Sequence, residues 1–89
     1  MRKLLLTHRA HDFLNELTAK SFRQVGRAVL SLLKDPRPPD SKLPSGFPYY
    51  RIDIGEYRIV SRFDEETLFV LFIGKRNDGD VYKELKRLF

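Results

Sequence analysis

The feature that most constrains the fold is a change in hydrophobic period across a proline-rich stretch. Between residues 10 and 33, apolar side chains recur every three to four positions, as on one face of a helix. From residue 50 onward they alternate with polar side chains, as in a half-buried strand. All five prolines lie between these parts, from Pro36 to Pro48. Because proline lacks an amide hydrogen and fixes φ, this stretch is predicted to be a loop joining helices to a sheet.

Two amphipathic helices are predicted in the part before the loop. Their apolar stripes comprise Ala10, Phe13, Leu14 and Leu17 in the first helix and Phe22, Val25, Val29, Leu32 and Leu33 in the second. The hydroxyls between Thr18 and Ser21 can cap a new helix start, so a helical hairpin is expected rather than one long helix. Because the hairpin cannot bury both stripes alone, we expect both helices to pack on a sheet.

Four strands and a short C-terminal helix complete the predicted fold. The apolar run at residues 3–7 is interpreted as a buried strand, and residues 68–73 are apolar on both faces, as in a central strand. Gly55 and Glu56 are predicted to form a type II′ hairpin turn. Residues 81–88 have the apolar spacing of a helix. The predicted class is α+β in the order βααβββα, with two N-terminal helices on one face of a twisted, mainly antiparallel sheet.

The hairpin turn also predicts which strand residues lie opposite one another. The predicted pairs are Ile54 with Tyr57, Asp53 with Arg58 and Ile52 with Ile59. Side chains alternate between the two faces of a sheet, so the face away from the helices collects the charged residues. This face, here called the arginine face, comprises Arg51, Asp53, Arg58 and Arg62. Continuing the count through the next turn places Ile73 opposite Arg58 and adds Lys75 to the arginine face. Cations fixed on a rigid sheet bind phosphates well, so this face is a candidate RNA-binding surface.

Composition narrows the class of protein and its partners. The 89 residues predict a single domain spanning residues 1–89. The net charge of +5 favours a nucleic acid or an acidic protein as partner, and a basic protein without such a partner is the alternative. The absence of cysteine excludes disulfide and thiolate chemistry. No run approaches the ~20 apolar residues of a membrane span, and no signal peptide is recognisable, so a cytoplasmic protein without a membrane partner is expected.

The two histidines are not predicted to bind a metal. His8 and His11 lie three residues apart at the start of the first helix, and no further histidine, cysteine or carboxylate set completes a metal site. They are interpreted as solvated helix residues. The sequence therefore predicts neither a metal nor a cofactor.

Short motifs connect the predicted elements to a known family. They are Lys42-Leu43, Tyr50-Arg51-Ile52, Tyr57-Arg58-Ile59-Val60, Gly74-Lys75-Arg76 and Val81-Tyr82. In these motifs and in the order of its elements, the chain resembles the RelE/ParE toxin superfamily of bacterial and archaeal toxin–antitoxin systems, and its RelE branch most closely. The resemblance covers nearly the whole chain. The tyrosine–arginine motif is shared with relatives that do not cut RNA, whereas the Gly-Lys-Arg motif with the later Val-Tyr favours the endoribonuclease branch.

The resemblance implies a ribosome-dependent endoribonuclease, an mRNA interferase that inhibits translation. Such toxins cleave mRNA in the ribosomal A site by attack of a ribose 2′-hydroxyl on the adjacent phosphate, and no metal takes part. The implied partners are a cognate antitoxin, the ribosome with its RNA, and mRNA. Operator DNA would be bound only by the toxin–antitoxin complex.

The resemblance also implies roles for individual residues. Arg58 and Arg76 match the two active-site arginines, Tyr82 matches the C-terminal tyrosine, and Arg51 matches a basic residue on the first hairpin strand. Where the family's enzymes can carry a further lysine, this chain has Asp53. The predicted catalytic residues are therefore Arg58, Arg76, Tyr82, Arg51 and Asp53, and the predicted RNA-binding residues are Lys42, Tyr49, Arg62 and Lys75. Tyr49 is expected on the arginine face, as a ring on which a base can stack.

Several alternatives stay open on the sequence alone. The general base is Asp53, Lys75 or a group supplied by the ribosome, because arginine is a poor proton shuttle. Arg58 is equally expected to form a cross-strand salt bridge with Asp53, and Tyr82 to pack on the sheet instead of stacking on a base. At the level of function, the alternatives are a ParE-like inhibitor of DNA gyrase and a catalytically weak, RNA-binding relative.

Overall fold

The computed structural model describes residues 2–39, 41–43 and 49–76. Its elements are β1 (Lys3–Leu6), α1 (His8–Glu16), α2 (Ala19–Lys34), β2 (Tyr50–Ile54), β3 (Tyr57–Phe63) and β4 (Thr67–Lys75). This order confirms the predicted succession of strand, two helices and three strands. The predicted C-terminal helix at residues 81–88, with Tyr82, lies outside the described residues. No described helix is both long enough and apolar enough to cross a membrane.

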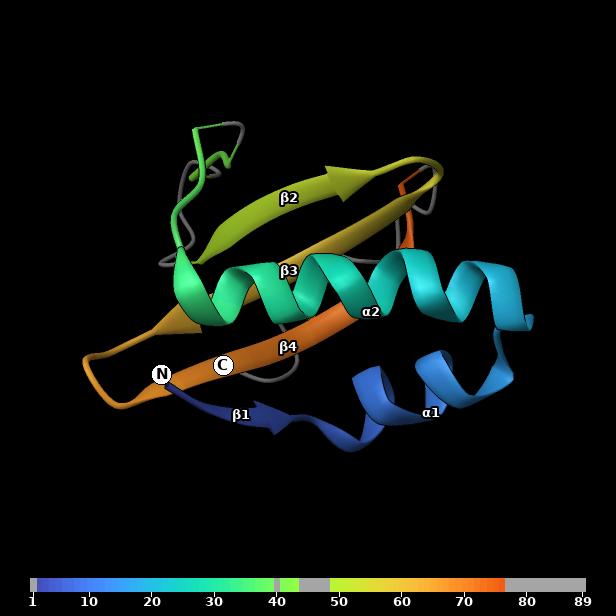
Figure 1. The fold of residues 1–89 in the computed structure, drawn as a ribbon, viewed down its shortest axis with the longest axis horizontal. Coiled ribbons are helices and arrows are strands. Elements are labelled where there is room, and N and C mark those ends of the chain that lie inside the picture. The colour runs from blue at the N-terminus through green and yellow to red at the C-terminus, as the bar shows by residue number, and fades with distance from the viewer. Residues whose placement is uncertain (1, 40, 44–48, 77–89) are drawn as a thin grey trace.

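The four described strands form one mixed sheet in the order β1-β4-β3-β2. β1 runs parallel to β4, whereas β2, β3 and β4 pair antiparallel. Both helices lie on the same side of this sheet, with α2 in front of β3 and β4 and α1 beyond the end of β1 (Figure 1). The predicted α+β architecture is therefore confirmed, and the arginine face is the one that α1 and α2 leave uncovered.

Threonine caps fix where the two helices begin. The Thr18 hydroxyl accepts the Ser21 amide at 3.3 Å at the start of α2. The Thr7 hydroxyl accepts the Ala10 amide at 3.2 Å at the start of α1. The same Thr7 hydroxyl donates to the Leu71 carbonyl at 2.8 Å and so attaches α1 to β4. The predicted helical hairpin is present, with its break where the hydroxyls lie.

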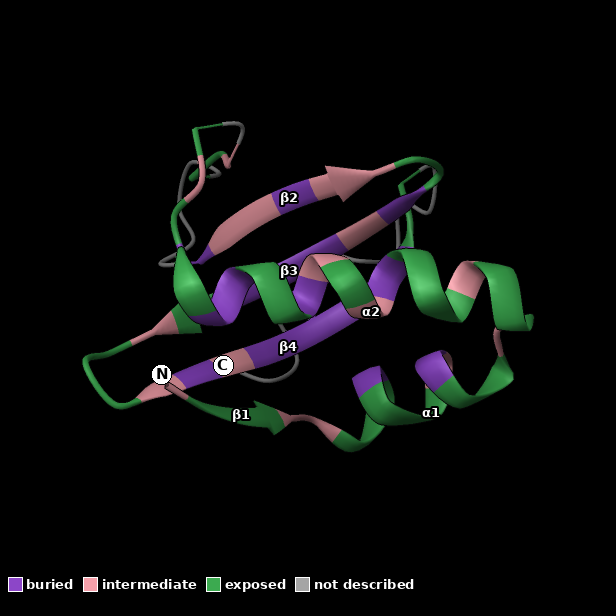
Figure 2. Ribbon diagram, in the orientation of Figure 1, coloured by how far each residue is buried: buried purple, intermediate pink, exposed green. Residues whose placement is uncertain are grey.

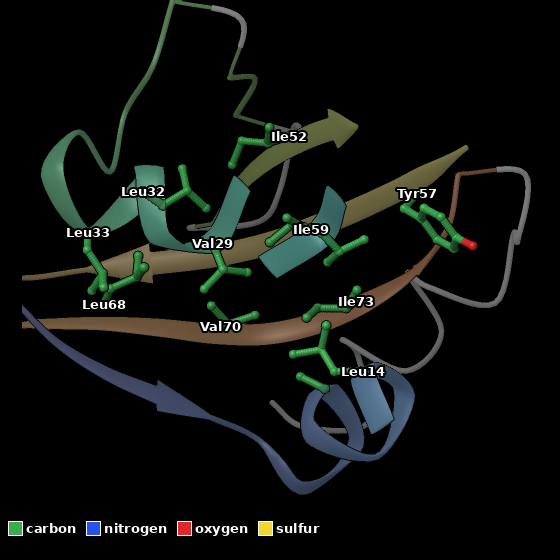
Figure 3. Close-up of a cluster of buried hydrophobic side chains, with 12 residues drawn as sticks. Leu14, Val29, Leu32, Leu33, Ile52, Tyr57, Ile59, Leu68, Val70 and Ile73 are labelled. Atoms are coloured by element: carbon green, nitrogen blue, oxygen red, sulfur yellow. The ribbon is translucent and has the colours of Figure 1, made fainter. Parts of the chain in front are cut away.

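The main core lies between the helices and the sheet. Its buried residues are Ala10, Leu14, Val25, Val29, Leu32, Leu33, Ile52, Tyr57, Ile59, Leu68, Val70 and Ile73. Figure 3 shows most of these side chains meeting between α2, α1 and the three long strands. The predicted helical stripes account for the helical half of this core with one exception, because Phe22 is 46% exposed. Phe22 lies one turn from the start of α2, on the flank of the buried stripe.

The prediction that the first strand is buried is wrong. β1 is a strand, but Leu4 is 36% and Leu5 is 52% exposed. β1 is at the edge of the sheet, and α1 begins two residues after β1 ends. The chain therefore turns into α1 beyond β1, and Figure 2 colours β1 as largely exposed. An apolar run thus marks a strand here without fixing its burial.

The β2–β3 hairpin has the predicted register. Ile54 pairs with Tyr57, and Asp53 pairs with Arg58. Gly55 has φ +56°. Among the described residues, none that is not a glycine has a positive φ. A positive φ at the first turn position alone fits the predicted type II′ turn.

The register between β3 and β4 departs from the predicted one at a bulge. Ser61 pairs with Val70 as predicted, but Val60 pairs with Phe72, so Leu71 is an extra residue in β4. A one-residue shift moves every following side chain to the opposite face. As a result Gly74, not Ile73, lies opposite Arg58, and Lys75 lies opposite Tyr57. The predicted placement of Lys75 on the arginine face is wrong for this reason.

Candidate active site on the arginine face

The centre of the candidate site is an ion pair between two cross-strand neighbours. The Arg58 Nε donates to Asp53 Oδ1 at 2.8 Å, and its Nη2 donates to Oδ2 at 3.4 Å. The hairpin register places these residues directly opposite each other on β3 and β2. Their side chains are 14% and 27% exposed, so the pair is partly shielded from water. The salt bridge that the sequence offered as an equal alternative is therefore present.

Three arginines act on the Asp53 carboxylate. The hydrogen bond from Arg58 is the largest cause of a lowered Asp53 pKa, and partial burial opposes it. The positive charges of Arg58, Arg51 and Arg76 lower the pKa further. Asp53 is consequently ionised at neutral pH. The structure thus brings together four of the predicted catalytic residues.

Arg76 is held beside the hairpin turn. Its backbone amide donates to the Glu56 carbonyl at 2.9 Å, and its Nη1 lies 3.4 Å from the Gly55 carbonyl, which accepts from it. The side chain is exposed just after the end of β4. The sequence left its direction open, because alternation ends with the strand. The turn between β2 and β3 supplies the contacts that place it near Asp53.

Arg51 is connected to the loop by its backbone. Lys42 and Arg51 exchange two hydrogen bonds, one from the Lys42 amide at 2.9 Å and one from the Arg51 amide at 2.7 Å. This bridge lies on the outer edge of β2. It brings the exposed Lys42 side chain to the same strand as Arg51 and Asp53.

Tyr49 lies on the expected side of the sheet but is buried. It packs in a second apolar cluster with Val60, Leu71 and Phe72, and it is only 3% exposed. Burial raises the pKa of the Tyr49 hydroxyl, against the opposing charge of Arg62. The prediction that Tyr49 offers a ring for stacking is wrong for this conformation, because neighbouring apolar side chains cover the ring.

Arg62 lies farther along β3 from the ion pair. Its guanidinium lies over the Phe69 ring, 4.5 Å from the ring centroid. Such a cation–π contact fixes the direction of the side chain without neutralising its charge. The residue is exposed on the arginine face, as the alternation predicts.

Gly74 belongs to the site, although the sequence reasoning named it only as part of the Gly74-Lys75-Arg76 motif and gave it no role. It is paired with Arg58 across β3 and β4. A Cβ at this position would collide with the ring of Phe72, which covers the glycine. A glycine within a strand is itself a signal that another group approaches closely. The close approach here is made by an aromatic ring of the second apolar cluster.

The arrangement is suited to binding and stabilising a phosphate. Guanidinium groups stay charged and can hold two oxygens at once. Asp53 offers an ionised carboxylate among them. In the described part of the chain, no group of three or more histidine, cysteine or acidic side chains could hold a metal ion. His8 and His11 are exposed on α1, in the helical layer.

Comparisons with known proteins identify similar folds. No protein-family model matches the chain, and a search of curated proteins finds no match. An arginine-to-alanine double mutant of the E. coli toxin RelE in the free state is 30% identical, with a TM-score of 0.80 over 99% of this chain and 98% of that one. The isolated E. coli RelE toxin is 29% identical, with a TM-score of 0.74 over 100% of both chains. A chain of the intact E. coli RelBE toxin–antitoxin complex is 26% identical, with a TM-score of 0.73 over 84% of this chain and 96% of that one.

Proposed function

This chain belongs to the RelE family of toxins, and on that premise we propose that it is a ribosome-dependent endoribonuclease that cleaves mRNA in the ribosomal A site. The observation that carries the proposal is the ion pair of Arg58 with Asp53 on the arginine face, where the positive charges of Arg51 and Arg76 also act on the same carboxylate. A phosphate could bind Arg58 in place of the carboxylate, and the charges of Arg51 and Arg76 would favour that exchange.

In the proposed reaction the arginines stabilise charge. The mRNA 2′-hydroxyl loses its proton to a base and attacks the adjacent phosphorus, the bond to the 5′-oxygen breaks, that oxygen takes a proton from water, and a 2′,3′-cyclic phosphate remains. Arg58 and Arg76 bind the phosphoryl oxygens as negative charge increases on them in the transition state. Arg51 adds a third positive charge on the same strand as Asp53. Loss of one such donor typically costs about 2.7–4 kcal/mol of activation free energy.

Asp53 is our proposed acceptor of the 2′-hydroxyl proton. While it is bonded to Arg58 its pKa is lowered, and this makes the carboxylate a weak base. When a phosphate takes its place on Arg58, the carboxylate loses that hydrogen bond and gains a negatively charged neighbour. Both changes raise its pKa and make it a better base. A ribosomal group remains the alternative base, and Lys75 is less favoured because it lies opposite Tyr57.

The other proposed contacts surround this centre. Lys42 and Arg62 are exposed and would bind RNA phosphates on either side of the cleaved bond. Tyr82 is proposed to stack on a base next to it, as the family resemblance implies. Contact of Tyr49 or Lys75 with RNA stays a prediction, and for Tyr49 it requires the ring to be uncovered.

The proposal includes partners and a compartment. We propose that residues 1–89 form one toxin domain, that it works in the cytoplasm on translating ribosomes, and that a cognate antitoxin neutralises it. The RelBE complex with a 26% identical toxin chain supports an antitoxin partner. Binding of operator DNA would require the toxin–antitoxin complex.

The decisive experiment is primer extension on mRNA from ribosomes programmed in vitro. The wild-type protein is expected to introduce a break within the A-site codon. Arg76→Ala is expected to lose that break, with a rate lowered about 10²–10³-fold. Arg23→Ala is the matched control, because it removes one exposed arginine from the helical layer, and it should cleave like the wild type.

Two results would contradict the proposal in different ways. Cleavage by Arg76→Ala at the wild-type rate would show that the active site lies elsewhere. No cleavage by the wild type would reject the nuclease itself, and a gyrase supercoiling assay would then test the ParE-like alternative.

A catalytically weak RNA-binding relative is the second candidate. It is favoured by the 2.8 Å bond between Arg58 and Asp53, since the carboxylate competes with phosphate for the guanidinium. In that case the wild type would bind programmed ribosomes without cutting mRNA, and Asp53→Lys would bind them more tightly.

A further inference from the structure

One flank of α2 carries an exposed apolar row that the fold does not use. Phe22 is 46% and Leu30 is 60% exposed, and Gly26 lies between them at a spacing of four residues. Together with Arg23 and Arg27 they line a shallow groove of about 210 Å³. Figure 1 shows α2 running across the front of the sheet, and Figure 2 shows the exposed segments along it.

Gly26 gives this groove its floor. A Cβ built at Gly26 would have no atom within 4 Å, so the fold of this chain does not require a glycine there. Glycine is a poor helix former, and its backbone φ here is not positive. A helix without a side chain at the centre of its outer row lets a second helix approach closely, with ridges at a spacing of four packing into grooves. The shape of the groove therefore fits another helix.

The rim of the groove is basic. Arg23 and Arg27 form the row next to the apolar one, and both are exposed. In the part of the chain that the structure describes, neither forms an ion pair with a carboxylate. Lys20 and Lys34 add charge at the two ends of α2. A helix seated in the groove would therefore place acidic residues beside these arginines.

Two other occupants fit less well. A second copy of this chain would bring the same arginines together across a two-fold axis, and like charges in one interface are unfavourable. RNA would satisfy the arginines through its phosphates, but a phosphate backbone seated on them would leave Leu30 uncovered. The groove also lies in the helical layer, whereas the candidate active site lies on the arginine face.

From this geometry we propose that the groove along Phe22, Gly26 and Leu30 binds an acidic amphipathic helix of the antitoxin. The inference rests on the proposed antitoxin partnership but not on mRNA cleavage. The partner helix presents small and apolar residues to Gly26 and Leu30, and its glutamates or aspartates pair with Arg23 and Arg27. The groove thus contributes affinity and specificity at a distance from Arg58 and Arg76.

The test is the affinity of the purified antitoxin for two groove variants. Leu30→Glu places a negative charge in the apolar row, and Gly26→Gln fills the floor of the groove with a side chain that the fold accommodates. Each is expected to weaken binding at least about tenfold. The control is Asn15→Glu, on the exposed face of α1. It changes the charge by the same amount as Leu30→Glu and is expected to bind like the wild type. Arg27→Gln should also make the affinity less sensitive to salt.

The fold and the cleavage activity are measured separately from binding. Circular dichroism and thermal unfolding should be close to wild type for both groove variants, and mRNA cleavage by the free toxin should be unchanged. If the wild type does not cleave, the binding comparison still tests the groove.

Equal affinity of wild type and variants would overturn the inference. A wild-type dimer that Leu30→Glu dissociates would assign the groove to a second copy, and a loss of ribosome cleavage with unchanged antitoxin affinity would assign it to RNA.

Discussion

At Asp53 a single carboxylate is ion-paired with Arg58, and its two hydrogen bonds from that guanidinium have opposed effects. They fix the direction of the guanidinium, because two parallel hydrogen bonds leave it little freedom. They also occupy the edge of Arg58 that would bind a phosphate. The same carboxylate therefore aligns the proposed catalytic group and competes with its substrate.

The ion pair should contribute to stability in a way that depends on pH. The Asp53 pKa in the native state is lowered, first by the hydrogen bond from Arg58, so it lies below the value of about 3.9 in the unfolded chain. The stabilisation is complete above that unfolded pKa and is lost as the pH falls through the native pKa. We expect Asp53→Asn to lower the free energy of unfolding by about 1–2 kcal/mol at pH 7. Chemical denaturation from pH 7 to pH 2 should show the difference from wild type shrinking in acid.

A difference between wild type and Asp53→Asn that stayed constant with pH would contradict this account. Asn15→Asp serves as a control, because it introduces a carboxylate on the exposed face of α1, where no arginine of the site lies.

At the scale of single elements, the bulge in β4 decides what the arginine face contains. Leu71 and Phe72 both join the second apolar cluster, although alternation would send them to opposite faces. The extra residue also places Gly74 beside Arg58 instead of a branched side chain. A bulge next to a functional site commonly redirects side chains in this way.

The contact between Gly74 and Phe72 should appear as an energetic coupling. Gly74→Ala is expected to lower the free energy of unfolding by about 1–3 kcal/mol, because the new methyl group displaces the Phe72 ring. Phe72→Leu creates room at the same place. The double variant is expected to be more stable than the sum of the two single changes predicts. Urea denaturation of all four proteins measures this coupling, and strict additivity would show that the ring does not limit residue 74.

Short-range features were predictable from the sequence, whereas features set by packing were not. The pairing of Asp53 with Arg58 follows from one two-residue turn. Between β3 and β4 the predicted pairing of residues is correct as far as Ser61 opposite Val70. It fails at Leu71 because residues 68–73 are apolar throughout, so the pattern does not reveal which residue is extra. The burial of Tyr49 likewise depends on side chains from β3 and β4 that the pattern does not place.

How deeply whole helices and strands are buried was the other feature that the sequence predicted only in part. The helical stripes predicted the core correctly except at Phe22, which is 46% exposed on the flank of α2. β1 was predicted as a strand, but its place at the edge depends on pairing with β4, a strand distant in sequence. Local periodicity contains no information about that pairing.

For the molecule as a whole, the sheet separates two apolar clusters on its opposite faces. Ile59 is fully buried in the cluster under the helices, and its neighbour Val60 is 1% exposed in the cluster on the arginine face. Because both residues belong to β3, loss of packing on one face should disturb the strand that supports the other.

We therefore expect cores on both faces to unfold together. Ile59→Ala should lower the free energy of unfolding by about 2–5 kcal/mol, and Val60→Ala by about 1–3 kcal/mol. Each variant should still unfold in one transition, with coincident curves from far-UV circular dichroism and tyrosine fluorescence. A separate early transition in Val60→Ala would show that the arginine face is an independent, weaker unit.

The parallel pairing of β1 with β4 has a consequence for the order in which the protein is made. Synthesis proceeds from the N-terminus, so β1 leaves the ribosome while its partner strand has not yet been translated. Gly74 and Arg76 follow later still, at the end of β4. The sheet and the proposed site can therefore assemble only after β4 and Arg76 have emerged. If the proposed attack on translating ribosomes is correct, no assembled site would be present while β4 is still being translated.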